Sequence, residues 1–288
     1  MRIAAFGLCV IAILGAAESP SQRLAAQLGE EAAKFAEKAP KVIAREVLRH
    51  RSLKPPPRFR PRVGESARKP LEATWIQREV VSEYGWASFQ DGGLNEIRQV
   101  IEVDGKKLPG SGRAVDSLAA MLTARNEERL KKQLRELEKH GLRGAASDFG
   151  QLILLFSKPR LAQFEIMPAR ITAEEAVFDF RQIDGMPAMT LFDAAKADRP
   201  VGLEIKGQIF VRPSDFRPFK ITLSAAPALG KEQVRQEAVI EYEQSPHGLL
   251  VPSRVVHREL RAGRVTLEND FRYQEFKIFG ASSEIKFE

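Results

Sequence analysis

Side chains that could perform catalysis or bind a metal are few and scattered in this sequence. The four histidines, His50, His140, His247 and His257, stand at no metal-site spacing such as HExxH. The glycine-rich patterns GxSxG, GxGxxG and GxxxxGK do not occur, so hydrolase, dinucleotide-binding and P-loop chemistry lack their usual support. We therefore expect no metal, no cofactor and no enzymatic activity.

Two further groups of polar residues have a simpler explanation than catalysis. Ser283 and Lys286 match the SxxK spacing of serine acyl enzymes, but on the expected terminal strand they point to opposite faces. Glu237, Glu241 and Glu243 share one strand face with no apolar pocket to raise a pKa. We expect chance to explain the first group and a solvent-facing surface the second.

The N-terminus is typical of a secretory signal peptide. Residues 1–17 contain one basic residue, an uncharged apolar core and small residues at the end. A transmembrane anchor is disfavoured because the core is shorter than the roughly 20 residues that span a bilayer. The single cysteine, Cys9, lies inside this segment, so the mature chain would have no disulfide and no cysteine zinc site. We expect a periplasmic or secreted protein.

The positive charge is concentrated in one segment. Nine basic residues stand between Arg45 and Lys69 against Glu46 and Glu65, a net of +7 that equals the charge of the whole chain. The rest of the chain is neutral, so we expect no nucleic-acid groove. Arg58, Arg60 and Arg62 lie in the proline-rich part of this segment. They could bind an anionic membrane surface or an envelope polymer, but a solvated spacer is the slightly favoured alternative.

Residues 18–70 are expected to form an N-terminal helical arm and the basic linker. Ser19, Pro20 and Gln22 form a capping box with proline at the first helical position, which predicts a helix start. After an interruption at Pro40, the sequence predicts a second helical piece that runs to about Arg49.

Residues 71–288 are expected to form an antiparallel sheet with a helical insertion at about 114–157. Alternating apolar and polar residues, as in the run 201–211, predict about ten strands from Trp75 onward. The insertion is expected to contain one helix from Val115 to His140 and a very apolar one from Ser147 to Phe156, buried against the sheet. The predicted fold class is α+β, a large curved antiparallel sheet shaped as a half-barrel.

The apolar side of this sheet has to be covered by helices or by a ligand. An ordinary core under the apolar helix and a cavity for an acyl chain or another hydrophobic molecule are about equally supported. The cavity hypothesis names residues of that helix and of the inner strand faces as ligand-binding candidates: Phe149, Leu152, Phe156, Ile205, Ile209, Ile221, Ile240, Phe271 and Tyr273.

The layout resembles that of periplasmic proteins of the outer-membrane lipoprotein-carrier type. The resemblance rests on the order of elements and on Gly207–Val211, Ile240–Tyr242, Leu250–Pro252 and Phe271–Tyr273. It covers about Trp75 to Phe287 and implies an unclosed β-barrel that holds lipid acyl chains beneath helices. The leading hypothesis is a non-enzymatic exported protein that binds a hydrophobic or lipid-like ligand.

Two alternatives remain open. One is a cell-envelope scaffold or interaction module without a small-molecule ligand. The less favoured one is an outer-membrane β-barrel, because such barrels rarely contain a helical insertion of this size and usually show aromatic girdles, which three Tyr and two Trp cannot supply alone.

Overall fold

The computed structural model describes residues 18–54, 74–89, 93–124, 127–142, 145, 148–183, 189–192, 200–227 and 234–279. The expected signal peptide, the basic residues Arg58, Arg60 and Arg62, and the Ser283–Lys286 pair lie outside these residues.

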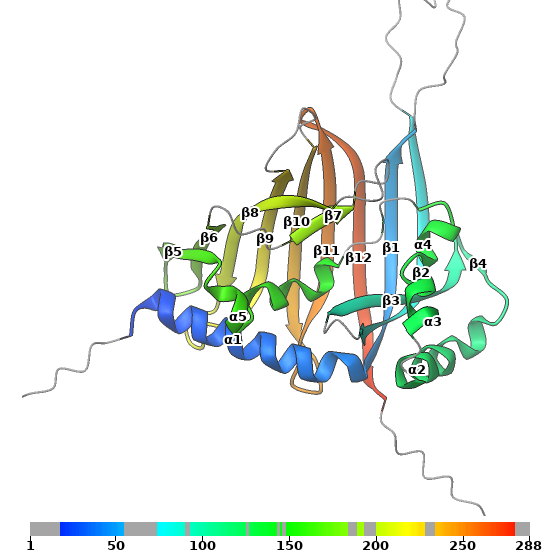
Figure 1. Ribbon diagram of the computed structural model, residues 1–288, viewed down its shortest axis with the longest axis horizontal. Helices are drawn as coiled ribbons and strands as arrows, with labels where there is room; N and C mark the ends of the chain where they lie inside the picture. Colours follow the sequence, from blue (N-terminus) through cyan, green and yellow to red (C-terminus); the bar gives the residue numbers. More distant parts are fainter. Residues whose placement is uncertain are drawn as a thin grey trace, which may run out of the picture.

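Within the described residues, the strands form one antiparallel sheet of twelve strands with two open edges (Figure 1). The order across the sheet is β4-β3-β2-β1-β12-β11-β10-β9-β8-β6-β5, with β7 paired to β8. The strands are β1 (Val42–Leu53), β2 (Trp75–Ser88), β3 (Leu94–Val103), β4 (Lys106–Lys107), β5 (Phe164–Ile171), β6 (Ala176–Gln182), β7 (Met189–Phe192), β8 (Pro200–Val211), β9 (Pro218–Pro227), β10 (Val234–Gln244), β11 (Leu250–Arg261) and β12 (Arg264–Ile278). The predicted fold class, α+β with a large unclosed antiparallel sheet, is confirmed.

The first and the last strands of the chain pair in the middle of the sheet. β1 lies between β2 and β12, with Leu48 opposite Val80 on one side and Phe271 on the other. The second helical piece that the sequence predicted up to Arg49 is therefore wrong. Glu46 and His50 occupy buried positions of β1 and hid the alternation that marks a strand.

Helix α1 (Pro20–Lys38) begins as the sequence predicts. The Ser19 hydroxyl accepts a hydrogen bond from the Gln22 backbone, and the Gln22 side chain accepts one from the Ser19 backbone. The short 3-10 turn η1 (Ala39–Lys41) then leads into β1. The buried side of α1 contains Leu24, Leu28, Ala32 and Phe35, and the helix lies across one face of the sheet (Figure 1).

The helical insertion differs from the two helices that were expected. The first is broken into the 3-10 turn η3 (Ser111–Arg113), α2 (Ala114–Ala124), α3 (Glu127–Gln133) and α4 (Glu136–Lys139). The second is η4 (Phe149–Phe156), which has 3-10 geometry with a kink at Gln151 and is followed by the short α5 (Lys158–Leu161). Six of the eight residues of η4 are buried, so the predicted burial is confirmed although the helix type is not.

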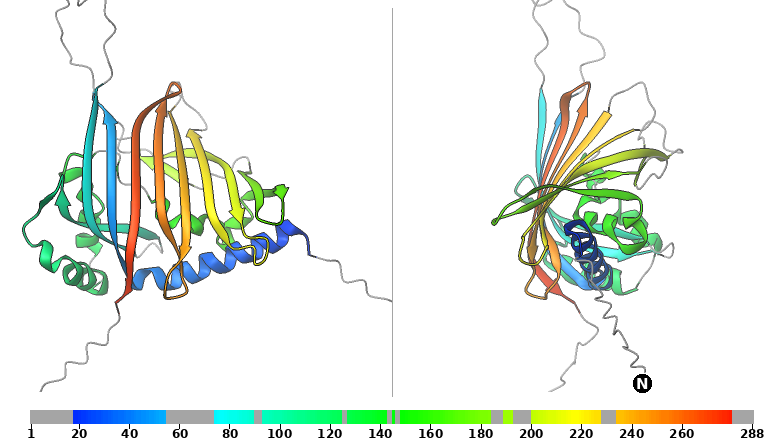
Figure 2. Two further views of the ribbon diagram at one scale, coloured as in Figure 1. Left: turned by 180° about the vertical axis from the view of Figure 1, so that it is seen from behind. Right: turned by 90° about the vertical axis from the view of Figure 1, so that its left-hand side faces the viewer.

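Two apolar cores lie on opposite faces of the curved sheet. The larger joins the concave face to α1, α4 and η4, while the smaller joins Ile43, Ala87 and Ile97 to Leu118 of α2 and Leu130 of α3. Figure 2 shows the strong curvature and the position of α1 on one side of it. No helix within the described ranges is both long enough and apolar enough to cross a membrane.

Candidate functional site

The residues that the sequence named as ligand-binding candidates meet in the larger core. Ile205 and Ile209 of β8, Ile221 of β9 and Ile240 of β10 share the concave face with Phe271 and Tyr273 of β12, and η4 contributes Phe149, Leu152 and Phe156. Each of them is less than a tenth exposed. The structure brings these side chains together, packed under η4 and α1, while their role in ligand binding stays a prediction.

Three carboxyl groups and one guanidinium lie where β1, β2 and β3 meet this core. Arg98 Nε donates to Glu46 Oε1 at 2.9 Å and Oε2 at 3.0 Å, and Arg98 Nη2 donates to Glu96 Oε2 at 2.5 Å. Glu46, Glu96 and Arg98 are buried, and Asp148, the N-cap residue of η4, interacts with the backbone of Glu96. Burying charge is costly unless partners compensate it, so this arrangement is unusual for an apolar core.

Aromatic rings enclose the charged group. The Arg98 guanidinium lies 5.1 Å from the Tyr84 ring centroid and 5.3 Å from that of Phe271. Tyr84 packs against Trp86 and Tyr273 with centroids 4.7 and 4.9 Å apart, and Trp86 contacts Phe35 of α1 at 5.2 Å. The cluster is therefore continuous with the contact between α1 and the sheet.

Sequence reasoning missed this cluster because it assigned β3 to the opposite parity. It grouped Ile97 with Val103 as the inner side and placed Glu96 and Arg98 outside. A register irregularity between Val81 and Ser82 places Val103 opposite Val80 and Val100 opposite Ser82, so the buried parity changes along β3. The available signal was the pair Glu96 and Arg98 in one strand with Glu46 in another, which can neutralise each other when buried.

The seam between this cluster and η4 contains polar atoms without partners. A Cβ atom at Gly150 would lie 2.7 Å from both Glu96 Oε1 and the Tyr84 hydroxyl, so only glycine leaves room for them. Within the described part of the chain, neither atom has a hydrogen-bond partner. Burial raises the pKa of Glu96 to about 8; attraction by Arg98 opposes the shift, and repulsion by Asp148 and Glu46 adds to it.

A second buried polar row crosses the concave face between β1 and β10. His50 Nδ1 lies 2.7 Å from Asn269 Oδ1, Asn269 Nδ2 lies 3.2 Å from His257 Nδ1, and His257 Nε2 lies 2.6 Å from Gln236 Oε1. Burial lowers the pKa of His257 to about 4 and also lowers that of His50. Residues of the described ranges form no group of three or more His, Cys, Asp or Glu side chains that could hold a metal ion.

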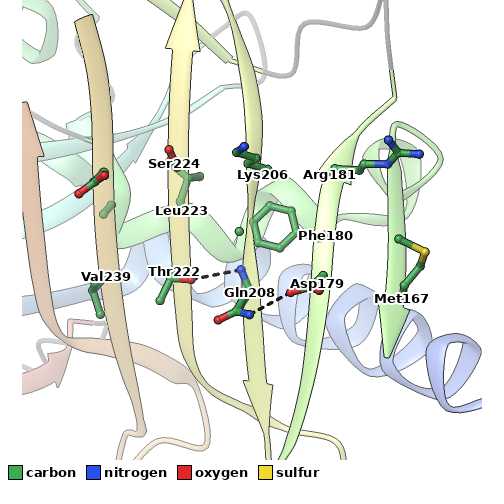
Figure 3. Close-up of a pocket in the computed structure, with 13 residues that line it drawn as sticks. Met167, Asp179, Phe180, Arg181, Lys206, Gln208, Thr222, Leu223, Ser224 and Val239 are labelled. Carbon is green, nitrogen blue, oxygen red and sulfur yellow. Dashed lines mark hydrogen bonds between the residues drawn. The ribbon is translucent and has the colours of Figure 1, made fainter. Parts of the chain in front are cut away.

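A shallow depression of about 500 Å³ lies on the opposite, outer face (Figure 3). Gln208 joins its neighbours there: its side chain donates to Asp179 at 2.9 Å, and its backbone donates to Thr222 at 3.2 Å. Lys206 and Arg181 lie on the same face. A second depression, of about 560 Å³, is lined by cross-strand ion pairs such as Arg49 with Glu79 and Arg51 with Glu268, both at 2.9 Å. Both depressions lie on the face away from the predicted ligand-binding residues.

The comparisons with known proteins concern the fold. No protein-family model matches the chain, and no curated protein matches it. The chain is similar to a solved structure. That structure is a LolA superfamily protein from Nitrosomonas europaea, 11% identical, and the match covers 92% of this chain and 97% of that chain at a TM-score of 0.33. At this TM-score the similarity carries no conclusion about family or function, and the resemblance to lipoprotein carriers stays a prediction.

Proposed function

We propose that this chain binds a hydrophobic or lipid-like ligand between the concave face of its sheet and η4, as an exported, periplasmic protein without enzymatic activity. The observation that carries the proposal is η4 itself. This apolar segment fills the curve of the sheet, where its residues join Ile209, Ile240 and Phe271 in one core. A ligand with an acyl chain would take the place of η4 against the same side chains.

The geometry of η4 supports its displacement. Runs of 3-10 helix longer than three or four residues are uncommon because their hydrogen bonds are poorly aligned, and η4 extends over eight residues with a kink. Among the described residues, buried oxygens of Tyr84, Glu96 and Gln151 lack hydrogen-bond partners. Each such atom costs about 1–3 kcal/mol. The packing of η4 against the sheet is therefore less stable than the burial of its apolar residues alone would make it.

The scaffold alternative has its own supporting observation. The candidate residues are packed against one another in a filled core, which is also what a protein without a ligand would show. The two functions differ in one property, because only the ligand-binding protein gains affinity for an apolar molecule when η4 is loosened.

Gly150→Ala provides the test. Its new methyl group would lie 2.7 Å from two oxygens and disfavours the seated position of η4. If the ligand site requires η4 to leave, the apparent dissociation constant for a fluorescent fatty-chain probe falls several-fold, since a larger fraction of the protein is competent to bind. Gly112→Ala is the matched control, because its Cβ meets nothing within 4 Å. No saturable binding in either variant or in the parent protein would refute the proposal.

A further inference from the structure

The seam under Gly150 contains two buried oxygen atoms without hydrogen-bond partners among the described residues. Arg98 directs Nε to Glu46, Nη2 to Glu96 Oε2, and also interacts with Tyr273. Glu96 Oε1 receives nothing, and the Tyr84 hydroxyl, fully buried, has no partner among the described residues. Both atoms point at the place where η4 passes. The polar end of a ligand that replaces η4 could therefore reach both atoms.

Acidic groups also outnumber basic groups around Glu96. Glu96 faces Glu46 from β1, Arg98 from β3 and Asp148 from the turn before η4. The phenols of Tyr84, Tyr242 and Tyr273 complete its surroundings. Above a pH of about 8, where Glu96 is ionised, one guanidinium faces three carboxylates. A cation placed beside Glu96 would reduce this excess.

We infer that Glu96 and Tyr84 form a head-group subsite for amphipathic ligands whose polar end is a cationic hydrogen-bond donor, such as a primary ammonium group. This inference rests on the proposed function, because the ligand has to displace η4 to reach the subsite. The acyl chain lies along the concave face, while the ammonium group donates to Glu96 Oε1 and the Tyr84 oxygen. Anionic head groups are rejected by the surrounding carboxylates.

Three single-chain ligands of equal length test the inference on the full mature chain: dodecylamine, dodecanol and dodecanoate. Each competes with a fluorescent fatty-chain probe. Dodecylamine is expected to bind at least about tenfold more tightly than dodecanoate, with dodecanol between them. Glu96→Gln is expected to reduce this difference to about twofold, and Tyr84→Phe to reduce it partly. Glu241→Gln, the same change at an exposed position of β10, is the matched control.

The pH dependence gives a second measurement that needs no variant. The ammonium group takes the place of a proton on Glu96, so dodecylamine binds more tightly as the pH rises from about 7 to about 9 while the amine stays charged. Equal affinities for the three ligands, or the same preference in Glu96→Gln as in Glu241→Gln, would overturn the head-group inference and leave the proposed function standing. Failure of all three ligands to bind would overturn both.

Discussion

At the scale of single residues, the concave core is unusual for the ionisable groups that it buries. Glu96 and His257 face the same core from different strands, and burial shifts their pKa values in opposite directions. Desolvation favours the neutral form of each group, which is the protonated carboxyl for Glu96 and the unprotonated imidazole for His257. The two residues therefore make opposite contributions to the pH dependence of folding.

Glu96 is expected to make the protein less stable as the pH rises. Its pKa is about 8 in the folded protein and 4.5 when unfolded. Between these values only the folded state keeps the proton, so the free energy of unfolding falls with a slope of at most about 1.4 kcal/mol per pH unit. Glu96→Gln should remove this slope. The slope is measured from the urea unfolding midpoints of the parent protein and Glu96→Gln across this pH range. The same pH dependence in both proteins would show that Glu96 does not cause it.

His257 is expected to act in the opposite direction at lower pH. Its pKa is 6.5 when unfolded and about 4 when folded, so protons bind preferentially to the unfolded chain between these values. Burying the unprotonated His257 side chain costs no stability above pH 6.5. As the pH falls to about 4, protonation favours the unfolded chain and stability is lost. His50, whose pKa is also lowered by burial, adds to the same slope.

The measurement compares His257→Gln with His247→Gln, a change at an exposed turn residue. Thermal unfolding between pH 4 and 7 should lose part of its pH dependence in the first variant only. An unchanged slope in His257→Gln would show that another group causes the acid sensitivity.

At the scale of elements, most strands could be predicted from the alternation of apolar and polar residues. The strand predictions failed where this alternation is interrupted. The runs at β8, β9 and β10 follow the period of two closely. β1 was missed because two of its inward-facing residues are polar. Glu46 and His50 are buried and hydrogen-bonded to Arg98 and Asn269, which are far away in the sequence. The 3-10 form of η4 could not be predicted, because its tertiary packing and not its local sequence determines it.

Gly207 is expected to be essential for the close approach of β8 and β9. A Cβ atom at this position would lie 1.9 Å from the Thr222 carbonyl oxygen and 2.8 Å from the Phe180 ring. Backbone has to shift to admit it, so Gly207→Ala should lower the free energy of unfolding by about 3 kcal/mol or more. Urea unfolding measures the loss, and Gly112→Ala serves as control. Equal stability of the two variants would show that the sheet can relax at this point.

At the scale of the whole molecule, one open sheet curves around its own helices, and its first and last described strands pair at its centre. β1 follows α1 after the short turn η1 and pairs with β12, so the helix that crosses the concave face is anchored to the centre of the sheet. The sequence predicted the curved sheet, its apolar face and the apolar segment that covers it. It could not predict the seam at Gly150, which forms only when β1, β2, β3 and η4 come together.

The central claim is that the concave face holds an apolar ligand, and the most direct test is to look for one. The protein is purified from its native cells without detergent, and the organic extract is measured by mass spectrometry against the amount of protein. A hydrophobic or amphipathic molecule in near-stoichiometric amount is the predicted result, and Gly150→Ala should retain it. An extract without such a molecule, together with no saturable binding of fatty-chain probes to the same preparation, would contradict the claim.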